Sequence, residues 1–315
     1  MRIDDLVKQS SKPFISIEII PPRKGVKLET LFGELEALMR HKPVFMSVTS
    51  HAHEWSIEKV NGKEVERMKH KRLDTNAICI AAQARFGIVP TPHIICRGFT
   101  KDETEDVLLT LHFHGIENVL ALRGDGPPTR GGSASPFANE YASDLVEQIQ
   151  RMNHGIYLDP IENADKTDFC VGVAGYPEKH FEAPDMATDL ANLKKKVDAG
   201  AHFIITQMFF DNEAFYRFRD EAHKIGINVP IIPGIKPLYK KEHLEALPRI
   251  FHTKIPQAVV DSVSSFIEPD DIYKAGIAST IAQCKDLLAH GVPGIHFYSM
   301  SLSKPTSDVL KGING

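Results

Sequence analysis

Residues 100–123, TKDETEDVLLTLHFHGIENVLALR, contain one complete helix signal followed by one strand signal. Thr100 and Glu103 have the spacing of a capping box, which marks a helix start. An apolar stripe at helical spacing follows, and Gly115 supplies the stop. The apolar run 118–123 comes directly afterwards and predicts a strand. A helix that leads at once into a strand is typical of a repeating βα chain.

The same alternation recurs along the whole chain. The predicted strands are 14–20, 44–49, 91–96, 118–123, 170–175, 203–210, 229–233 and 294–300. Two of the helices between them end at Gly200 and Gly226. Eight βα units in 315 residues, somewhat above the barrel length of about 250, favour a closed barrel over an open sheet. We therefore expect an α/β fold: a single-domain (β/α)8 TIM barrel over residues 1–315.

Two insertions account for the extra length. Residues 57–74 are rich in Lys, Glu and Arg, and we expect a solvated loop after the second strand. Residues 126–140 are rich in Gly, Pro and Ser and follow the fourth strand, on the face where barrels keep their chemistry. This position favours a lid.

Bulk composition limits the classes of partner. A net charge of −4 with a pI near 6.4 provides no basic field for nucleic acid, and no apolar run is long enough to span a bilayer. The acidic start of the chain is unlike a secretory signal, so we expect a cytoplasmic protein. The four cysteines lie far apart with no C-x-x-C pair, so we expect neither disulfides nor a thiolate metal site.

Glu18 is a charged residue inside the apolar strand FISIEII. Strand alternation puts Ser16 and Glu18 on one face and the isoleucines on the other. One interpretation is an ion pair inside the barrel, for example with Arg123. The other is a general acid, because a carboxyl in a partly dry pocket has a raised pKa. The residues alone leave both open.

Further polar residues follow later strands. Arg123, Gly124 and Asp125 combine a cation and an anion with a glycine that allows close approach of the backbone to a ligand. The amide of Gln207 can donate and accept at once, as recognition of a heterocycle requires. We expect these residues at the carboxyl ends of the strands.

His51 and His53 permit a different hypothesis. Neighbouring imidazoles can share a metal ion, and a metal-dependent barrel hydrolase could add His93 and His180 to them. Such an enzyme would also need an Asp at the end of its last strand, and 297–300 contains none. We therefore expect no metal and keep the hydrolase as the alternative function.

Taken together, the motifs resemble the methylenetetrahydrofolate reductase family from about residue 14 to residue 300. The matching stretches are Glu18-Ile-Ile-Pro-Pro-Arg23, Ser47-Val-Thr49, Pro92-His93, Ala121-Leu-Arg-Gly-Asp125, Tyr141-Ala-Ser-Asp144, Tyr176-Pro-Glu-Lys-His180, Leu193-Lys-Lys-Lys-Val-Asp-Ala-Gly200, Thr206-Gln-Met-Phe-Phe-Asp211 and Ile232-Pro-Gly-Ile235. The resemblance implies an oxidoreductase of one-carbon and methionine metabolism with FAD across the strand ends. It also implies NADH or NADPH as electron donor, and a homo-oligomer.

The resemblance also implies roles for single residues. Those implied to bind cofactor are Thr49, His93, Arg123, Gly124, Asp125, Ala142, Tyr176, His180, Ala183, Asp189, Asn192 and Lys196. Asp125, Gln207 and His243 would bind the folate substrate, and Thr49 and Gln207 would touch the nicotinamide donor. Glu18 and Asp125 would be catalytic in a ping-pong hydride transfer, with Glu18 as the acid that opens the five-membered ring. That role requires a carboxyl still protonated near neutral pH, which burial can provide.

The chain departs from the family pattern in several places. After the seventh strand, Leu247 stands where the family has an aromatic residue, and His243 stands where it has a substrate-binding glutamine. Ser50-His-Ala-His-Glu-Trp55 replaces the usual residues after Thr49. Leu302 stands where an arginine would meet the folate tail, with Lys304 nearby as a substitute cation. Nothing in the sequence separates NADH from NADPH.

Overall fold

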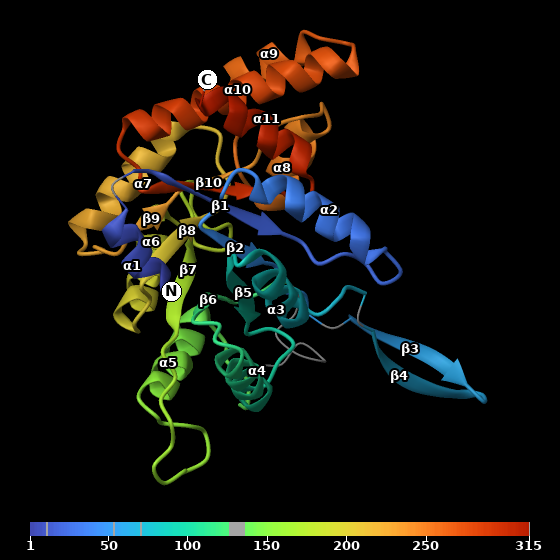
Figure 1. Ribbon diagram of the computed structural model, residues 1–315, viewed down its shortest axis with the longest axis vertical. Helices are drawn as coiled ribbons and strands as arrows, with labels where there is room; N and C mark the ends of the chain where they lie inside the picture. Colours follow the sequence, from blue (N-terminus) through green and yellow to red (C-terminus); the bar gives the residue numbers. More distant parts are fainter. Residues whose placement is uncertain (11, 53, 70, 126–135, 315) are drawn as a thin grey trace.

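A computed structural model describes residues 1–10, 12–52, 54–69, 71–125 and 136–314. Within them, nine strands form one parallel sheet in the order β10-β11-β1-β2-β5-β6-β7-β8-β9. Their bounds are β1 Phe14–Ile19, β2 Phe45–Val48, β5 Val89–Ile95, β6 Asn118–Leu122, β7 Cys170–Gly175, β8 Phe203–Thr206, β9 Ile231–Ile232, β10 Gly234–Ile235 and β11 Gly294–Tyr298. Figure 1 shows helices packed around this sheet.

The sheet closes on itself through the segment 231–235. Only Pro233 separates β9 from β10, so the two are halves of one strand. β9 pairs with β8, and β10 pairs with β11. The ring of eight strands is therefore complete, and the predicted (β/α)8 barrel is confirmed.

Most strand ends lie within one or two residues of the prediction, and two strands show where the pattern misleads. The strand predicted at 203–210 ends at Thr206, because Met208 and Phe210 leave the sheet and pack against Leu238 and Leu247. The strand predicted at 229–233 runs from 231 to 235 with a break at the proline. An apolar run continues past the strand in the first case, so the sequence pattern did not mark where pairing stops.

Helices connect the strands and cover the outside of the barrel. Their bounds are α1 Ile3–Gln9, α2 Leu28–Met39, α3 Thr75–Phe86, α4 Lys101–Phe113, α5 Ala142–Asn153, α6 Met186–Asp198, α7 Asn212–Lys224, α8 His243–Phe251, α9 Gln257–Ser264, α10 Pro269–Ala289 and α11 Ser303–Asn314. The capping box of Thr100 and Glu103 is present at the start of α4. None of the helices in the described part of the chain is long and apolar enough to cross a membrane.

Residues 54–69 form an antiparallel hairpin, β3 Glu54–Val60 and β4 Lys63–Lys69, where the sequence predicted a loop. The missed signal is Asn61-Gly62. Both residues have positive φ, 51° and 77°, as a two-residue hairpin turn requires. The hairpin extends away from the barrel (Figure 1). Residues 126–135, most of the second predicted insertion, lie outside the described residues.

Two apolar layers hold the barrel. Ile17, Met46 and Val119 point outward into the large core between strands and helices. Phe14, Phe45 and Phe203 point inward and, with Ile3 of α1, fill the end of the barrel where the strands begin. A dry plug at this end leaves the opposite end for polar side chains. All four cysteines are buried and free.

Candidate active site

Above the phenylalanine plug, the inward-facing side chains become polar. His296 of β11 is fully buried, and its ring stacks on Phe45 with centroids 5.7 Å apart. Its Nδ1 lies 2.8 Å from Ser16 Oγ, and its Nε2 lies 3.1 Å from Ser47 Oγ. These bonds tie three strands together and hold the imidazole in one orientation.

Glu18 of β1 lies one inward position above Ser16. Its side chain faces two imidazoles: Oε2 is 3.3 Å from Nε2 of His93 and 3.9 Å from Nε2 of His296. Glu18 and His93 are each only 7% exposed. The interpretation of an ion pair inside the barrel was right about the place but not about Arg123, because the partner of Glu18 is His93. Nη2 of Arg123 instead lies 2.5 Å from Oε2 of Glu182.

Electrostatics also correct the expected protonation of Glu18. Burial raises the pKa of this carboxyl, but the imidazoles of His296 and His93 outweigh burial and lower the pKa to about 2. The expectation that burial keeps Glu18 protonated near neutral pH is wrong for this arrangement. In this structure the two imidazoles therefore favour the ionised carboxyl of Glu18.

The turn after β6 is built around Gly124. This residue has φ +84°, and a Cβ there would lie 3.2 Å from Cβ of Ile95. Glycine therefore lets the chain turn tightly against β5. The turn leaves Arg123 half-buried and Asp125 exposed at the end of the strand.

A second polar cluster lies at the end of β7 and the start of α6. The rings of Tyr176 and His180 meet edge to face, with centroids 4.7 Å apart. The backbone N–H of His180 donates to Oδ2 of Asp189 over 3.1 Å, and Nζ of Lys196 donates to the carbonyl of Ala174 over 2.5 Å. Burial lowers the pKa of Lys196 to about 8, although Asp189 opposes that shift. These residues, separated by up to 20 positions in sequence, therefore share one site.

The remaining predicted residues have separate environments. Ala142 is the first residue of α5, and Ala183 is buried just before α6. Asn192 is exposed on α6, and its Oδ1 accepts from Nζ of Lys195 over 3.2 Å. Oγ1 of Thr49 is buried without a hydrogen-bond partner among the described residues.

Gln207 directly follows β8, whereas His243 is the first residue of α8. The backbone N–H of Gln207 donates to the carbonyl of Gly175 over 2.8 Å, which fixes the residue beside β7. Its Oε1 accepts from the N–H of Met208 over 2.9 Å. The buried ring of His243 packs against Tyr239 with centroids 4.3 Å apart.

Lys236 is a site residue that the sequence prediction missed. It directly follows β10, is 4% exposed, and donates from Nζ to the carbonyl of Tyr298 over 3.0 Å. Burial lowers its pKa to about 8, although the charge of Glu18 opposes that shift. A lysine one residue after the apolar run Ile-Ile-Pro-Gly-Ile was the available signal.

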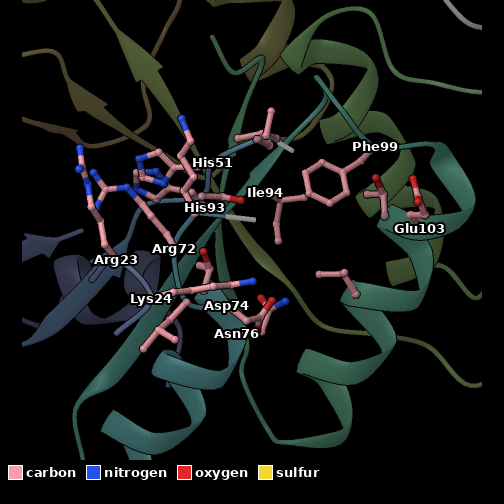
Figure 2. A pocket seen from close by; sticks show the side chains of 18 residues that line it. Arg23, Lys24, His51, Arg72, Asp74, Asn76, His93, Ile94, Phe99 and Glu103 are labelled. Atoms are coloured by element: carbon pink, nitrogen blue, oxygen red, sulfur yellow. The ribbon is translucent and has the colours of Figure 1, made fainter. Parts of the chain in front are cut away.

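A cavity of about 540 Å³ opens beside His93 (Figure 2). One wall is basic, with side chains from the loop after β1 and from the segment after the hairpin. The other is apolar, with side chains from β5 and α4. The lining residues are Arg23, Lys24, Ser50, His51, Ala52, Lys71, Arg72, Leu73, Asp74, Thr75, Asn76, His93, Ile94, Ile95, Phe99, Glu103, Thr104 and Val107. We call this cavity the basic pocket.

The metal alternative gains no support from this geometry. The described residues contain no group of three or more His, Cys, Asp or Glu side chains arranged to hold a metal ion. His53 lies outside them. Burial and the nearby Arg72 and His93 lower the pKa of His51.

Comparison with known proteins identifies the relatives of this chain. The family model described as methylenetetrahydrofolate reductase matches residues 2–314. The 5,10-methylenetetrahydrofolate reductase of Escherichia coli is 35% identical over 290 residues, which cover 91% of this chain and 86% of that protein. The methylenetetrahydrofolate reductase (NADH) 1 of Arabidopsis thaliana is 32% identical over 99% of this chain and 51% of its own length. The chain thus spans about half of the plant relative.

Two further comparisons bear on the donor and on the fold. A probable methylenetetrahydrofolate reductase (NADPH) of Caenorhabditis elegans is 31% identical over 99% of this chain and 44% of its own length. Among solved structures, a Clostridium thermocellum protein that binds two copies of 5-methyl-5,6,7,8-tetrahydrofolic acid has a TM-score of 0.61. It covers 99% of this chain and 97% of its own, at 14% identity, and so supports the fold alone.

Proposed function

Because this chain belongs to the methylenetetrahydrofolate reductase family, a family of oxidoreductases, we propose that it reduces 5,10-methylenetetrahydrofolate to 5-methyltetrahydrofolate. The cofactor would be FAD, and the electron donor NADH or NADPH. The observation that carries this assignment is the Glu18–His93 pair. It joins two of the family motifs at the strand ends, deep enough to exclude most water.

Several features of the strand ends fit FAD. Oγ1 of Thr49 and Nε of Arg97 are buried polar atoms with no hydrogen-bond partner among the described residues. Gly124 lets the turn after β6 lie close to Ile95, with Arg123 and Asp125 at the strand end. The half-buried Lys196 suits a phosphate, and the buried Asp189 suits a ribose hydroxyl. The residues proposed to hold the cofactor are Thr49, His93, Arg123, Gly124, Asp125, Ala142, Tyr176, His180, Ala183, Asp189, Asn192 and Lys196.

When bound, FAD would supply a two-electron store that takes hydride from the nicotinamide and gives it to the folate. The chain's own residues position the two substrates. Gln207 is proposed to contact both, because a ping-pong cycle lets them use one place in turn. Asp125 would bind the pterin, and His243 the folate.

Ring opening of the folate requires a proton at the departing nitrogen. Glu18 is anionic beside two imidazoles, so a carboxyl acting alone does not fit. We propose that the Glu18–His93 pair acts as one acid, in which Glu18 gives the proton to the substrate and exchanges it with its neighbour His93. The 3.3 Å between Nε2 and Oε2 allows this transfer after a small movement.

Steady-state turnover tests the assignment. The purified protein, supplied with FAD, methylenetetrahydrofolate and either nicotinamide, should form 5-methyltetrahydrofolate detectable by mass spectrometry. Omission of FAD from protein stripped of flavin should abolish the product. Absence of product with both donors and added FAD would refute the proposed function.

A further inference from the structure

The insertion after β2 ends by bringing basic residues to the rim of the barrel. The segment that follows the hairpin pairs with the loop after β1. The N–H of Lys24 donates to the carbonyl of Lys71, and the N–H of Leu73 donates to the carbonyl of Pro22, each over 3.0 Å. Arg23 and Arg72 are opposite each other in an isolated antiparallel β-bridge between these two segments. The pairing brings two basic dipeptides, Arg23-Lys24 and Lys71-Arg72, to one wall of the basic pocket.

Three of these cations, Arg23, Lys24 and Arg72, have no carboxylate partner in the described part of the chain. The pocket's own acids serve helix starts. Oδ1 of Asp74 accepts from the N–H of Ala77 over 2.8 Å, and Oε2 of Glu103 accepts from the N–H of Thr100 over 2.7 Å. Burial and the adjacent guanidinium of Arg23 lower the pKa of Arg72. Two guanidinium groups held together without a carboxylate favour a doubly charged anion.

The facing wall suits a flat ring. Ile94, Ile95, Phe99 and Val107 line it from β5 and α4, and Figure 2 shows the phenyl ring of Phe99 across the pocket from Arg23 and Arg72. The N-terminal turns of α3 and α4 also border the pocket, and such turns favour negative charge. The two walls together therefore suit a ligand in which a planar ring is joined to a phosphate.

We propose that the basic pocket binds the adenosine 2′-phosphate end of NADPH and makes this chain select NADPH over NADH. This inference rests on the proposed function, because it names the donor for that reaction. His93 lines the pocket and also pairs with Glu18, so the pocket opens directly onto the reacting centre. A phosphate monoester is a compact dianion that two arginines can hold in bidentate fashion. The glutamate tail of folate offers separate single charges on a flexible chain, so it matches two neighbouring arginines less well.

Binding of 2′,5′-ADP, measured by calorimetry against 5′-AMP, tests the pocket independently of turnover. The wild-type chain should bind 2′,5′-ADP at least tenfold more tightly than 5′-AMP. Arg23→Ala should reduce that preference about tenfold or more, as expected for loss of a charge-assisted contact. Arg72→Ala should do the same, and Arg23 provides the cleaner test because Nη1 of Arg72 also donates to the carbonyl of Pro21. Arg67→Ala on the hairpin, where Arg67 is exposed and paired with Glu58, should leave the preference unchanged.

Steady-state kinetics test the same preference in the working enzyme. The ratio of kcat/KM for NADPH to that for NADH should favour NADPH in the wild type and fall at least tenfold in Arg23→Ala. Equal binding of 2′,5′-ADP and 5′-AMP by the wild type would overturn the proposal. So would an Arg23→Ala effect confined to the preference for triglutamyl over monoglutamyl folate. Selective binding of 2′,5′-ADP without any folate reduction would uphold the pocket and refute the proposed function instead.

Discussion

At the residue scale, Glu18 illustrates how neighbours decide the state of a buried carboxyl. Strand alternation correctly placed it inside the barrel, and burial alone would have raised its pKa. His93 and His296 come from strands 75 and 278 residues further along the chain. Their closeness to Glu18 depends on barrel closure, which no local pattern contains. The position of the acid was therefore predictable, whereas its charge was not.

Glu18→Gln should separate the two half-reactions. The amide cannot relay a proton, so we expect the flavin to be reduced by the nicotinamide at a near-normal rate while folate reduction falls at least about a hundredfold. Glu36→Gln on the exposed face of α2 is the matched control and should change neither rate. Equal loss of both half-reactions in Glu18→Gln would count against the proton-transfer role. Stopped-flow absorbance of the flavin measures the rate of each half-reaction separately.

The buried charge of Lys236 should lower the free energy of unfolding at neutral pH. Burial lowers its pKa from the ordinary 10.5 to about 8 in the folded chain, so the buried charge destabilises the fold below about pH 8. The cost disappears as the pH rises through 10.5. Lys236→Met should therefore raise the free energy of unfolding at about pH 7, by at most about 3 kcal/mol, and the gain should shrink towards about pH 10.

Urea denaturation at the two pH values measures this effect of Lys236→Met. Lys240→Met, in the same segment but exposed, should change stability by no more than about 0.5 kcal/mol. A destabilised Lys236→Met variant at about pH 7 would show that the hydrogen bond to Tyr298 outweighs the cost of burying the charge.

At the element scale, local signals were sufficient wherever a helix or strand is defined by its own residues. The capping box at Thr100 and the glycine stops placed α4, α6 and α7 correctly. The hairpin β3–β4 was missed because its charged residues resemble a solvated loop, although Asn61-Gly62 carried the turn signal. Periodicity alone does not distinguish an exposed ribbon from a loop.

Barrel closure at β10 depends on Gly234. A Cβ at this position would overlap the carbonyl oxygen of Thr206 and the ring of Tyr298, neither of which can move freely. Gly234→Ala should therefore destabilise the fold by about 1–3 kcal/mol or more. Thermal unfolding followed by circular dichroism measures the loss.

Gly33→Ala is the matched control for this substitution. Gly33 is exposed within α2 and has open space around it, so alanine there should stabilise the chain by about 0.5–1 kcal/mol. If Gly234→Ala unfolds at the wild-type temperature, the close packing assigned to β10 is wrong.

At the scale of the whole molecule, the barrel and the family were predictable because both depend on patterns repeated over the entire chain. The basic pocket was not. It requires the loop after β1 to pair with residues beyond the hairpin, about 50 positions later. Lys236 was missed for the same reason, since the charges that act on it include Glu18, which lies on the distant strand β1. Local sequence patterns do not predict such contacts between elements that are far apart in the chain.

The central claim is that the barrel end holds a flavin-dependent reductase. Anaerobic stopped-flow spectroscopy of the FAD-loaded protein tests it most directly. NADPH should bleach the visible flavin absorbance, and methylenetetrahydrofolate added to the reduced protein should restore it at a rate consistent with turnover. Flavin that is not bleached by either nicotinamide, or that stays reduced when the folate is added, would contradict the account.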